Sequence, residues 1–210
     1  MGKTAASRPG SDEGQRRIIA AARDAFATFG FEGASLRAIS AAAGVLHTAM
    51  LYHYSSKDAL WRAVMSELFG DLEARLLGRV TAMQGQDQTV VARQLLHDFV
   101  YFCAERPELH RIMTMEGRSD TPRLAWLVEN HTRRLYETVS SMHAALDGPT
   151  RFEDPARLYY AIIGLAASTF TLAPEHRRLS GRDAFAPDEI AATATLVERL
   201  IFGTPVPEVK

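Results

Sequence analysis

The sequence predicts an all-α protein made of a small N-terminal helical bundle and a larger C-terminal helical domain. Apolar residues recur at spacings of three and four along most of the chain, which is the period of an amphipathic helix. Helix-starting pairs such as Thr121-Pro122 and Asp154-Pro155, and helix-ending glycines such as Gly30 and Gly117, divide this pattern into segments. No stretch shows the alternation of a half-buried strand.

Composition narrows the functional class. The chain has 210 residues, of which 47% are hydrophobic and 23% charged, as in ordinary globular proteins. Its one cysteine, Cys103, excludes an internal disulfide and lies in an apolar run, as an inert buried thiol would. No apolar stretch approaches a membrane span, and residues 1–10 lack the apolar core of a signal peptide, so we expect a cytoplasmic protein without a membrane partner.

Charge is distributed unevenly along the chain. The formal net charge of the whole chain is −1. Residues 1–60, however, carry seven Lys and Arg against five Asp and Glu, a net charge of +2. This sign suits nucleic-acid binding, although the excess is small.

Three helices are predicted before residue 55. The first covers residues 12–29 and ends at Gly30. The second begins at Ser35, a good N-cap whose hydroxyl could accept a backbone hydrogen bond, and stops at Gly44. The third covers residues 46–54. We expect their shared core to contain Phe26, Phe29, Phe31, Leu36, Ile39 and Val45.

Residues 35–57 have the pattern of a helix-turn-helix. The turn around Gly44 is too short for antiparallel helices, so the two helices should cross steeply and one should project outward. Ser55, with Asp58 three residues later, resembles a capping box that starts the next helix. Lys57 is a poor match for that helix N-terminus unless a phosphate lies nearby. The alternative is a helical corner without a nucleic-acid role.

The rest of the chain predicts the C-terminal helices. A long helix starting at Lys57 should connect both parts, and a polar break follows at residues 84–88. We expect further helices over residues 90–104, 109–116, 122–146, 155–172 and 190–201, with a charged loop at residues 175–183. The predicted divisions are a disordered arm (1–11), a helix-turn-helix domain (12–58), a helical effector-binding and dimerisation domain (59–203) and a flexible tail (204–210).

Residues 13–65 resemble the DNA-binding domain of the tetracycline-repressor (TetR) family. The resemblance rests on the ordered motifs A-x-x-x-F-x-x-x-G-F, S-L-R-A-I, A-A-G-V and S-K-D-A-L. It implies a bacterial transcription regulator, usually a repressor, that dimerises through a variable C-terminal domain which often binds a small molecule. Two positions depart from the family pattern: Leu46 replaces the usual polar N-cap, and Leu51 replaces a phosphate-binding Tyr, with Tyr52 one residue later.

The resemblance suggests which side chains face DNA. Thr48 and Ala49 could contact thymine methyl groups or base edges, and His47 could donate to a base or a phosphate. Arg37, Tyr52, His53 and Lys57 suit phosphate contacts, which fix the register without specifying sequence. The candidate DNA-binding residues are Ser35, Arg37, His47, Thr48, Ala49, Tyr52, His53 and Lys57.

The C-terminal aromatic residues and methionines allow two interpretations. From periodicity alone we expect most of them to form ordinary core, whereas the resemblance favours some of them lining a pocket for a small apolar or amphipathic effector. His110, Glu116 or His131 could then be polar anchors. The candidate ligand-binding residues are Phe99, Phe102, His110, Met113, Glu116, Trp126, His131 and Phe170.

Catalysis and metal binding lack a sequence signature. The histidines do not show the i, i+4 spacing of a two-ligand metal site. Neither a glycine-rich phosphate loop nor a G-x-S-x-G motif occurs. We therefore expect a protein that is not an enzyme and needs neither cofactor nor metal.

The last two long helices predict a dimer. Their small residues allow close helix approach, and two such pairs would form a four-helix bundle about a two-fold axis. Two recognition helices could then bind a palindromic operator, and an effector would release the repressor. The alternatives are a regulator without a small-molecule ligand, favoured by a tightly packed C-terminal domain, and a small helical enzyme or carrier. The small residues are Ala161, Gly164, Ala166, Ala167, Ser168, Ala191, Ala192 and Ala194.

Overall fold

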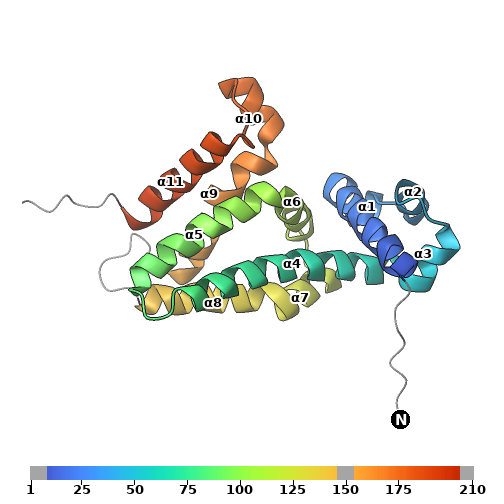
Figure 1. Cartoon of the computed structure of the whole chain (residues 1–210), viewed down its shortest axis with the longest axis horizontal. Coiled ribbons are helices and arrows are strands. Elements are labelled where there is room, and N and C mark those ends of the chain that lie inside the picture. The colour runs from blue at the N-terminus through green and yellow to red at the C-terminus, as the bar shows by residue number, and fades with distance from the viewer. Residues whose placement is uncertain (1–8, 146–153, 204–210) are drawn as a thin grey trace, which may run out of the picture.

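The computed structural model describes residues 9–145 and 154–203, which form only helices and their connections (Figure 1). Most of the predicted arm, the predicted helix end near Gly148 and the tail lie outside the described residues. The elements are α1 (Pro9–Gly33), α2 (Leu36–Ala42), α3 (His47–His53), α4 (Lys57–Ala82), α5 (Gln88–Glu105), α6 (Pro107–Glu116), α7 (Pro122–Leu127), η1 (Val128–Thr132), α8 (Arg133–Ala145), α9 (Pro155–Thr171), α10 (Ala173–Ser180) and α11 (Pro187–Phe202).

Helices α1, α2 and α3 form the predicted N-terminal bundle. Gly30 adopts φ 67° and ψ 179°, which interrupts α1 before one further turn ends at Gly33. Because the chain bends there, Phe31 turns back to stack on buried Phe26, with ring centroids 6.1 Å apart. The placement of Phe29 in the core was wrong, since its side chain is 64% exposed.

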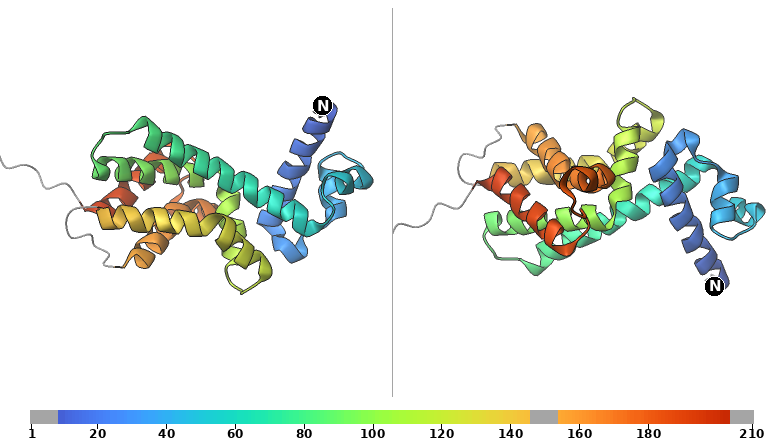
Figure 2. Two further views of the ribbon diagram at one scale, coloured as in Figure 1. Left: turned by 90° about the horizontal axis from the view of Figure 1, so that it is seen from below. Right: turned by 90° about the horizontal axis from the view of Figure 1, so that it is seen from above.

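Helix α4 connects the two parts of the molecule. It contacts α1 at one end and runs along α5 over the rest of its length (Figure 2). Its buried face contains Leu60, Val64, Leu68 and Leu72, four residues apart as predicted. The N-cap is Ser56, whose hydroxyl accepts a hydrogen bond from the backbone N–H of Ala59 at 3.0 Å, so the prediction of Ser55 was one residue early.

The cap at Thr121 forms as predicted, but the helix that it starts is not uniform. Thr121 accepts a hydrogen bond from the N–H of Leu124 at 3.0 Å, ahead of Pro122 in the first turn. At Val128 the helix widens into the π-helical segment η1. Within it, the ring of His131 stacks on Phe69 of α4, with centroids 4.7 Å apart and planes 4° apart. The uniform helix predicted from residue 122 is therefore divided into α7, η1 and α8.

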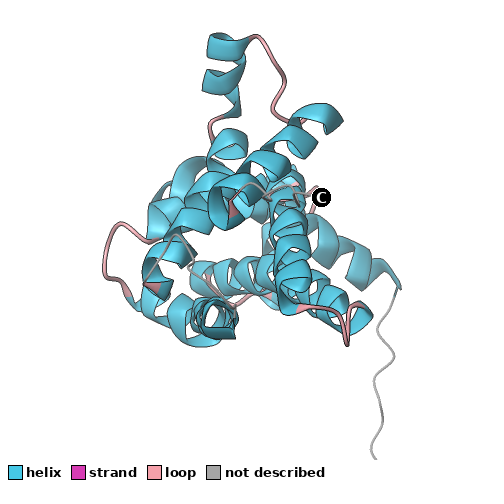
Figure 3. Cartoon of the chain, turned by 90° about the vertical axis from the view of Figure 1, so that its left-hand side faces the viewer, coloured by secondary structure: helices cyan, strands magenta, loops and turns pink. Residues whose placement is uncertain are grey.

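The loop predicted at residues 175–183 was wrong, because most of this segment belongs to helix α10. Pro174 lies in its first turn and Gly181, with φ 73°, ends it. The helix was not predicted because the segment is highly charged and has no buried apolar face; none of its residues is buried. Figures 1 and 3 show α10 projecting from the helical body.

The second core lies between α5, α9 and α11. Ala166, Ala167 and Ala194 are buried in it, so these members of the predicted dimer face pack within the subunit instead. Gly164 and Ser168 of α9 remain exposed, as do Ala191 and Ala192 of α11. Among the described helices, none is by itself long and apolar enough to cross a membrane; α9 with α10 meets that length and composition only as a pair bent by 72°.

Candidate nucleic-acid interface and internal cavity

The turn between α2 and α3 is fixed by backbone hydrogen bonds. Gly44, at φ 63°, donates to the carbonyl of Ala41 at 3.1 Å, and Val45 donates to that of Ser40 at 3.0 Å. The hydroxyl of buried Ser40 donates to the carbonyl of Arg37 at 2.9 Å. Ser35 takes the N-cap position as predicted, yet its hydroxyl makes no capping hydrogen bond.

Helix α3 is held by one side and exposed on the other. Met50 is fully buried against the bundle and anchors the helix. Thr48, Ala49 and Tyr52 are exposed, the last to 87% of its surface. The geometry therefore presents the polar hydroxyl of Thr48 and the phenol of Tyr52 on one short projecting helix.

The adjacent aromatic residues separate into different environments. Tyr54 is buried, its hydroxyl accepts a hydrogen bond from Gln15 of α1 at 3.1 Å, and burial raises its pKa. His53 is half-buried, with its ring between those of Tyr52 and Tyr54. His47 is also half-buried, and its Nδ1 is enclosed without a hydrogen-bond partner.

Three basic residues lie on the helices next to α3 in the bundle or in the chain. Arg37 is exposed on α2. Lys57 donates from Nζ to the carbonyl of Glu32 at 3.1 Å and lies 4.8 Å from the centroid of Phe31, so its charge is partly engaged by the C-terminal end of α1. Arg17 of α1, absent from the predicted set, lies over the turn, because a Cβ added to Gly44 would be 3.4 Å from its guanidinium. From the sequence, Arg17 could have been recognised only as a basic residue near the start of α1.

Arg123 of α7 connects the C-terminal domain to the N-terminal bundle. Its guanidinium carbon lies 3.8 Å from the ring centroid of Phe31. The same group pairs with Glu116 at 3.1 Å and with Glu32 at 3.6 Å. Glu116 is buried and also accepts from the hydroxyl of Thr121 at 2.5 Å. These side chains form a junction between the domains, which we call the Arg123 junction.

A cavity of about 520 Å³ lies inside the C-terminal domain. Its volume falls within the range of ~300–1,000 Å³ typical of small-molecule sites. Helices α4, α5, α6, α8 and α9 supply most of its wall, which is largely aliphatic and aromatic. Representative lining residues are Leu72, Leu76, Leu96, Phe99, Leu135, Val139 and Ile162.

The cavity brings together half of the candidate ligand-binding residues. Phe99, Phe102, His110 and Met113 line it. The other four lie elsewhere: Glu116 is in the Arg123 junction, and Phe170 is buried in the second core. Trp126 packs against Trp61, and the ring of His131 lies between Phe69 and Trp126. Helical periodicity predicts that the eight candidate side chains face inward. It does not predict whether each one packs against other side chains or lines a cavity.

Burial favours the uncharged form of three titratable groups in the cavity wall, His110, Tyr159 and Cys103. It lowers the pKa of His110, favouring the neutral imidazole, and raises the pKa of Tyr159 to about 12, with a smaller contribution from Tyr160. It also raises the pKa of the Cys103 thiol to about 12, as expected for an inert thiol.

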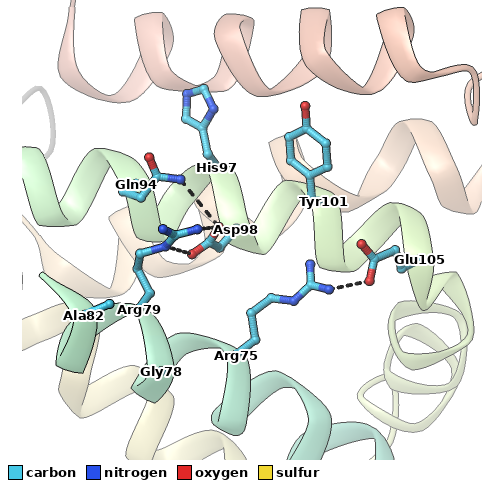
Figure 4. Close-up of a pocket in the computed structure, with 9 residues that line it drawn as sticks. All are labelled: Arg75, Gly78, Arg79, Ala82, Gln94, His97, Asp98, Tyr101 and Glu105. Atoms are coloured by element: carbon cyan, nitrogen blue, oxygen red, sulfur yellow. Dashed lines mark hydrogen bonds and ion pairs between the residues drawn. The ribbon is translucent and has the colours of Figure 1, made fainter.

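A second, open pocket of about 670 Å³ lies between α4 and α5 and is polar (Figure 4). Arg79 makes two hydrogen bonds to Asp98, at 2.5 and 2.9 Å, and Arg75 pairs with Glu105. These pairs explain the pocket as a salt-bridged surface between two helices. Elsewhere in the described residues, no cluster of three or more His, Cys, Asp or Glu is placed to hold a metal ion.

Comparisons with known proteins agree with this geometry. Residues 18–64 match the family of bacterial regulatory proteins named tetR. The chain is 26% identical over 191 residues to the HTH-type transcriptional regulator RutR of Escherichia coli K12, covering 89% of this chain and 88% of RutR. It is 29% identical over 195 residues to the HTH-type transcriptional repressor Rv1474c of Mycobacterium tuberculosis, covering 89% and 92%.

A solved structure has the same fold. AibR, crystallised with isovaleryl coenzyme A and operator DNA, superposes with a TM-score of 0.73 at 15% identity, over 90% of this chain and 98% of AibR. At this identity the likeness establishes the arrangement of the helices only.

Proposed function

We propose that this chain is a DNA-binding transcriptional regulator of the TetR family, and that it is a repressor that a small molecule releases from a palindromic operator. The proposal rests on two features found in the same chain. Helix α3 is exposed, with Met50 holding it against the bundle, and the C-terminal domain contains an apolar cavity. An apolar cavity of this size weighs against a regulator without a ligand, which would have a tightly packed C-terminal domain.

The proposed DNA contacts follow from exposure. Thr48 and Ala49 would face base edges in the major groove, with Tyr52 and Arg37 on the flanking phosphates. Arg17 is added to the predicted phosphate contacts. Ser35, His53 and Lys57 remain candidates at the edge of the surface, while His47 is partly turned inward.

The proposed mechanism uses two arrangements of a dimer. Without ligand, the two α3 helices would lie ~34–36 Å apart, matching successive major-groove segments on one face of the duplex. A ligand enclosed by α4 and its neighbours would favour a second arrangement, which α4 and the Arg123 junction would communicate to the N-terminal bundle. AibR, solved with both an acyl ligand and operator DNA, is a precedent for both partners on this fold.

The test is selection of bound duplexes from a random pool. We expect a palindromic consensus and an affinity that falls steeply with salt concentration. Thr48→Ala should change the preferred bases, whereas Arg37→Ala should weaken all duplexes about equally. Arg178→Ala, on exposed α10, serves as the charge-matched control and should leave affinity unchanged. Failure to select any sequence would contradict the proposal.

A further inference from the structure

The charged groups of the cavity wall already have partners. Among the described lining residues, counted with histidine neutral, Glu73, Arg106 and Arg134 carry a formal charge. His143 of α8 also lines the cavity and is engaged in an interaction of its own. Arg134 pairs with Glu73 at 3.5 Å, and Arg106 pairs with Asp71 of α4 at 3.2 Å. The side chains of Arg134 and Arg106 are also substantially exposed, so their guanidinium groups lie at the rim. An anion or cation inside would therefore meet no free countercharge from the described part of the wall.

The described wall also contains hydrogen-bonding side chains without a formal charge, among them Thr132 and Thr138, whose hydroxyl donates to the carbonyl of Arg134. His110 of α6 and Tyr159 of α9 both line the cavity, and these two helices are in contact. Among the described residues, neither the His110 ring nor the Tyr159 hydroxyl makes a hydrogen bond. The imidazole can donate or accept according to its tautomer, and the phenol can do both. They can satisfy a hydroxyl, carbonyl or ester oxygen, but they cannot neutralise a carboxylate.

We propose that the ligand of this cavity is an uncharged, predominantly apolar molecule with one hydrogen-bonding oxygen, and that carboxylates and amines are excluded. The inference rests on the proposed function, in which this cavity is the effector site. Its physical basis is desolvation: an ion taken from water into an apolar enclosure loses hydration that only a countercharge could replace. An uncharged oxygen loses far less, and His110 or Tyr159 can replace its hydrogen bonds with water.

The experiment compares ligands that differ only in the head group. The full-length protein is titrated at neutral pH with decanol and decanoate, and with naphthalenemethanol and naphthoate, all kept monomeric in solution. Binding is measured by calorimetry and by the shift of the melting temperature. We expect the alcohol of each pair to bind at least ~10-fold more tightly than the acid.

A designed countercharge should reverse this preference. Met113→Lys places an ammonium group on the cavity wall, where it should favour the acid of each pair over the alcohol. Thr114→Lys adds the same charge to the next residue, whose side chain is exposed outside the cavity, and should leave the preference unchanged. If Met113→Lys does not fold, the comparison of alcohols with acids in the natural chain still tests the inference.

The outcomes separate the two proposals. Equal or tighter binding of the acids to the natural chain would overturn the inference while leaving an effector cavity in place. Binding of none of the four probes would overturn the inference together with the effector part of the proposed function. The DNA-binding part would then still be judged by the duplex selection.

Discussion

At the scale of the residue, neighbouring side chains of the same type have different roles. Tyr52 and Tyr54 are two positions apart, yet the first is almost fully exposed and the second is buried with Gln15. The sequence left open which aromatic residue faces the phosphate backbone. Exposure makes Tyr52 the candidate, because a buried phenol that is already hydrogen-bonded cannot reach a partner outside the bundle.

The first prediction concerns this phenol. Tyr52→Phe removes one hydroxyl per subunit while keeping the ring, so it should cost two phosphate hydrogen bonds in the dimer, about 2 kcal/mol or roughly 30-fold in affinity. The loss should be similar on every duplex, because phosphates carry no sequence information. Fluorescence anisotropy with several duplexes measures it. Tyr101→Phe, exposed on α5, is the control, and a loss confined to one sequence would contradict the phosphate role.

At the scale of the element, the start of a helix was easier to predict from the sequence than the side chains against which that helix packs. Thr121 and Asp154 cap their helices as their Ser/Thr/Asp-Pro signals indicated, because capping depends on a few adjacent residues. The π-helical segment at His131 and the packing of Phe170 were not predictable, because both depend on residues distant in sequence. The same reason explains why only half of the candidate ligand residues reach the cavity.

The second prediction concerns the Arg123 junction. Arg123→Ala leaves the buried carboxylate of Glu116 without its ionic partner and uncovers Phe31. Because an unpaired buried charge is costly, we expect the variant to lose about 2–3 kcal/mol of unfolding free energy. Urea denaturation measures this loss. Arg133→Ala, exposed on α8, should change it by less than ~0.5 kcal/mol; equal effects from both variants would contradict the assigned role.

The third prediction concerns the contact between α5 and α11. Glu198 accepts hydrogen bonds from His97 and Arg93, both at 2.6 Å, and these partners lower its pKa below 4.5. A carboxyl group whose pKa is lower in the folded than in the unfolded chain stabilises the fold at pH values above its unfolded pKa. This contribution is lost as the pH falls below about 4.5.

Glu198→Gln should therefore cost about 1 kcal/mol at pH 7, and its difference from the natural chain should shrink as acid is added. Denaturation in urea between pH 7 and pH 3 tests this. Glu137→Gln, exposed on α8, should follow the natural chain throughout. A penalty that is constant with pH would show that the charge of Glu198 is not responsible.

At the scale of the whole molecule, one short recognition helix needs a second copy. Helix α3 has seven residues and can contact only a few base pairs. The outer faces of α9 and α11 carry exposed apolar side chains, including Tyr160, Leu196 and Leu200. We propose this surface as the two-fold contact, with Gly164, Ser168, Ala191 and Ala192 allowing close approach.

The last prediction tests this surface. Leu196 is 56% exposed on α11, and Leu196→Glu would place two like charges near the proposed two-fold axis. The variant should elute as a monomer in light-scattering chromatography and lose at least ~100-fold in operator affinity, because the monomer binds only a half-site. Val90→Glu, on an exposed apolar residue of α5, is the matched control and should remain dimeric. A Leu196→Glu variant that stays dimeric and binds the operator normally would place the subunit contact on another face.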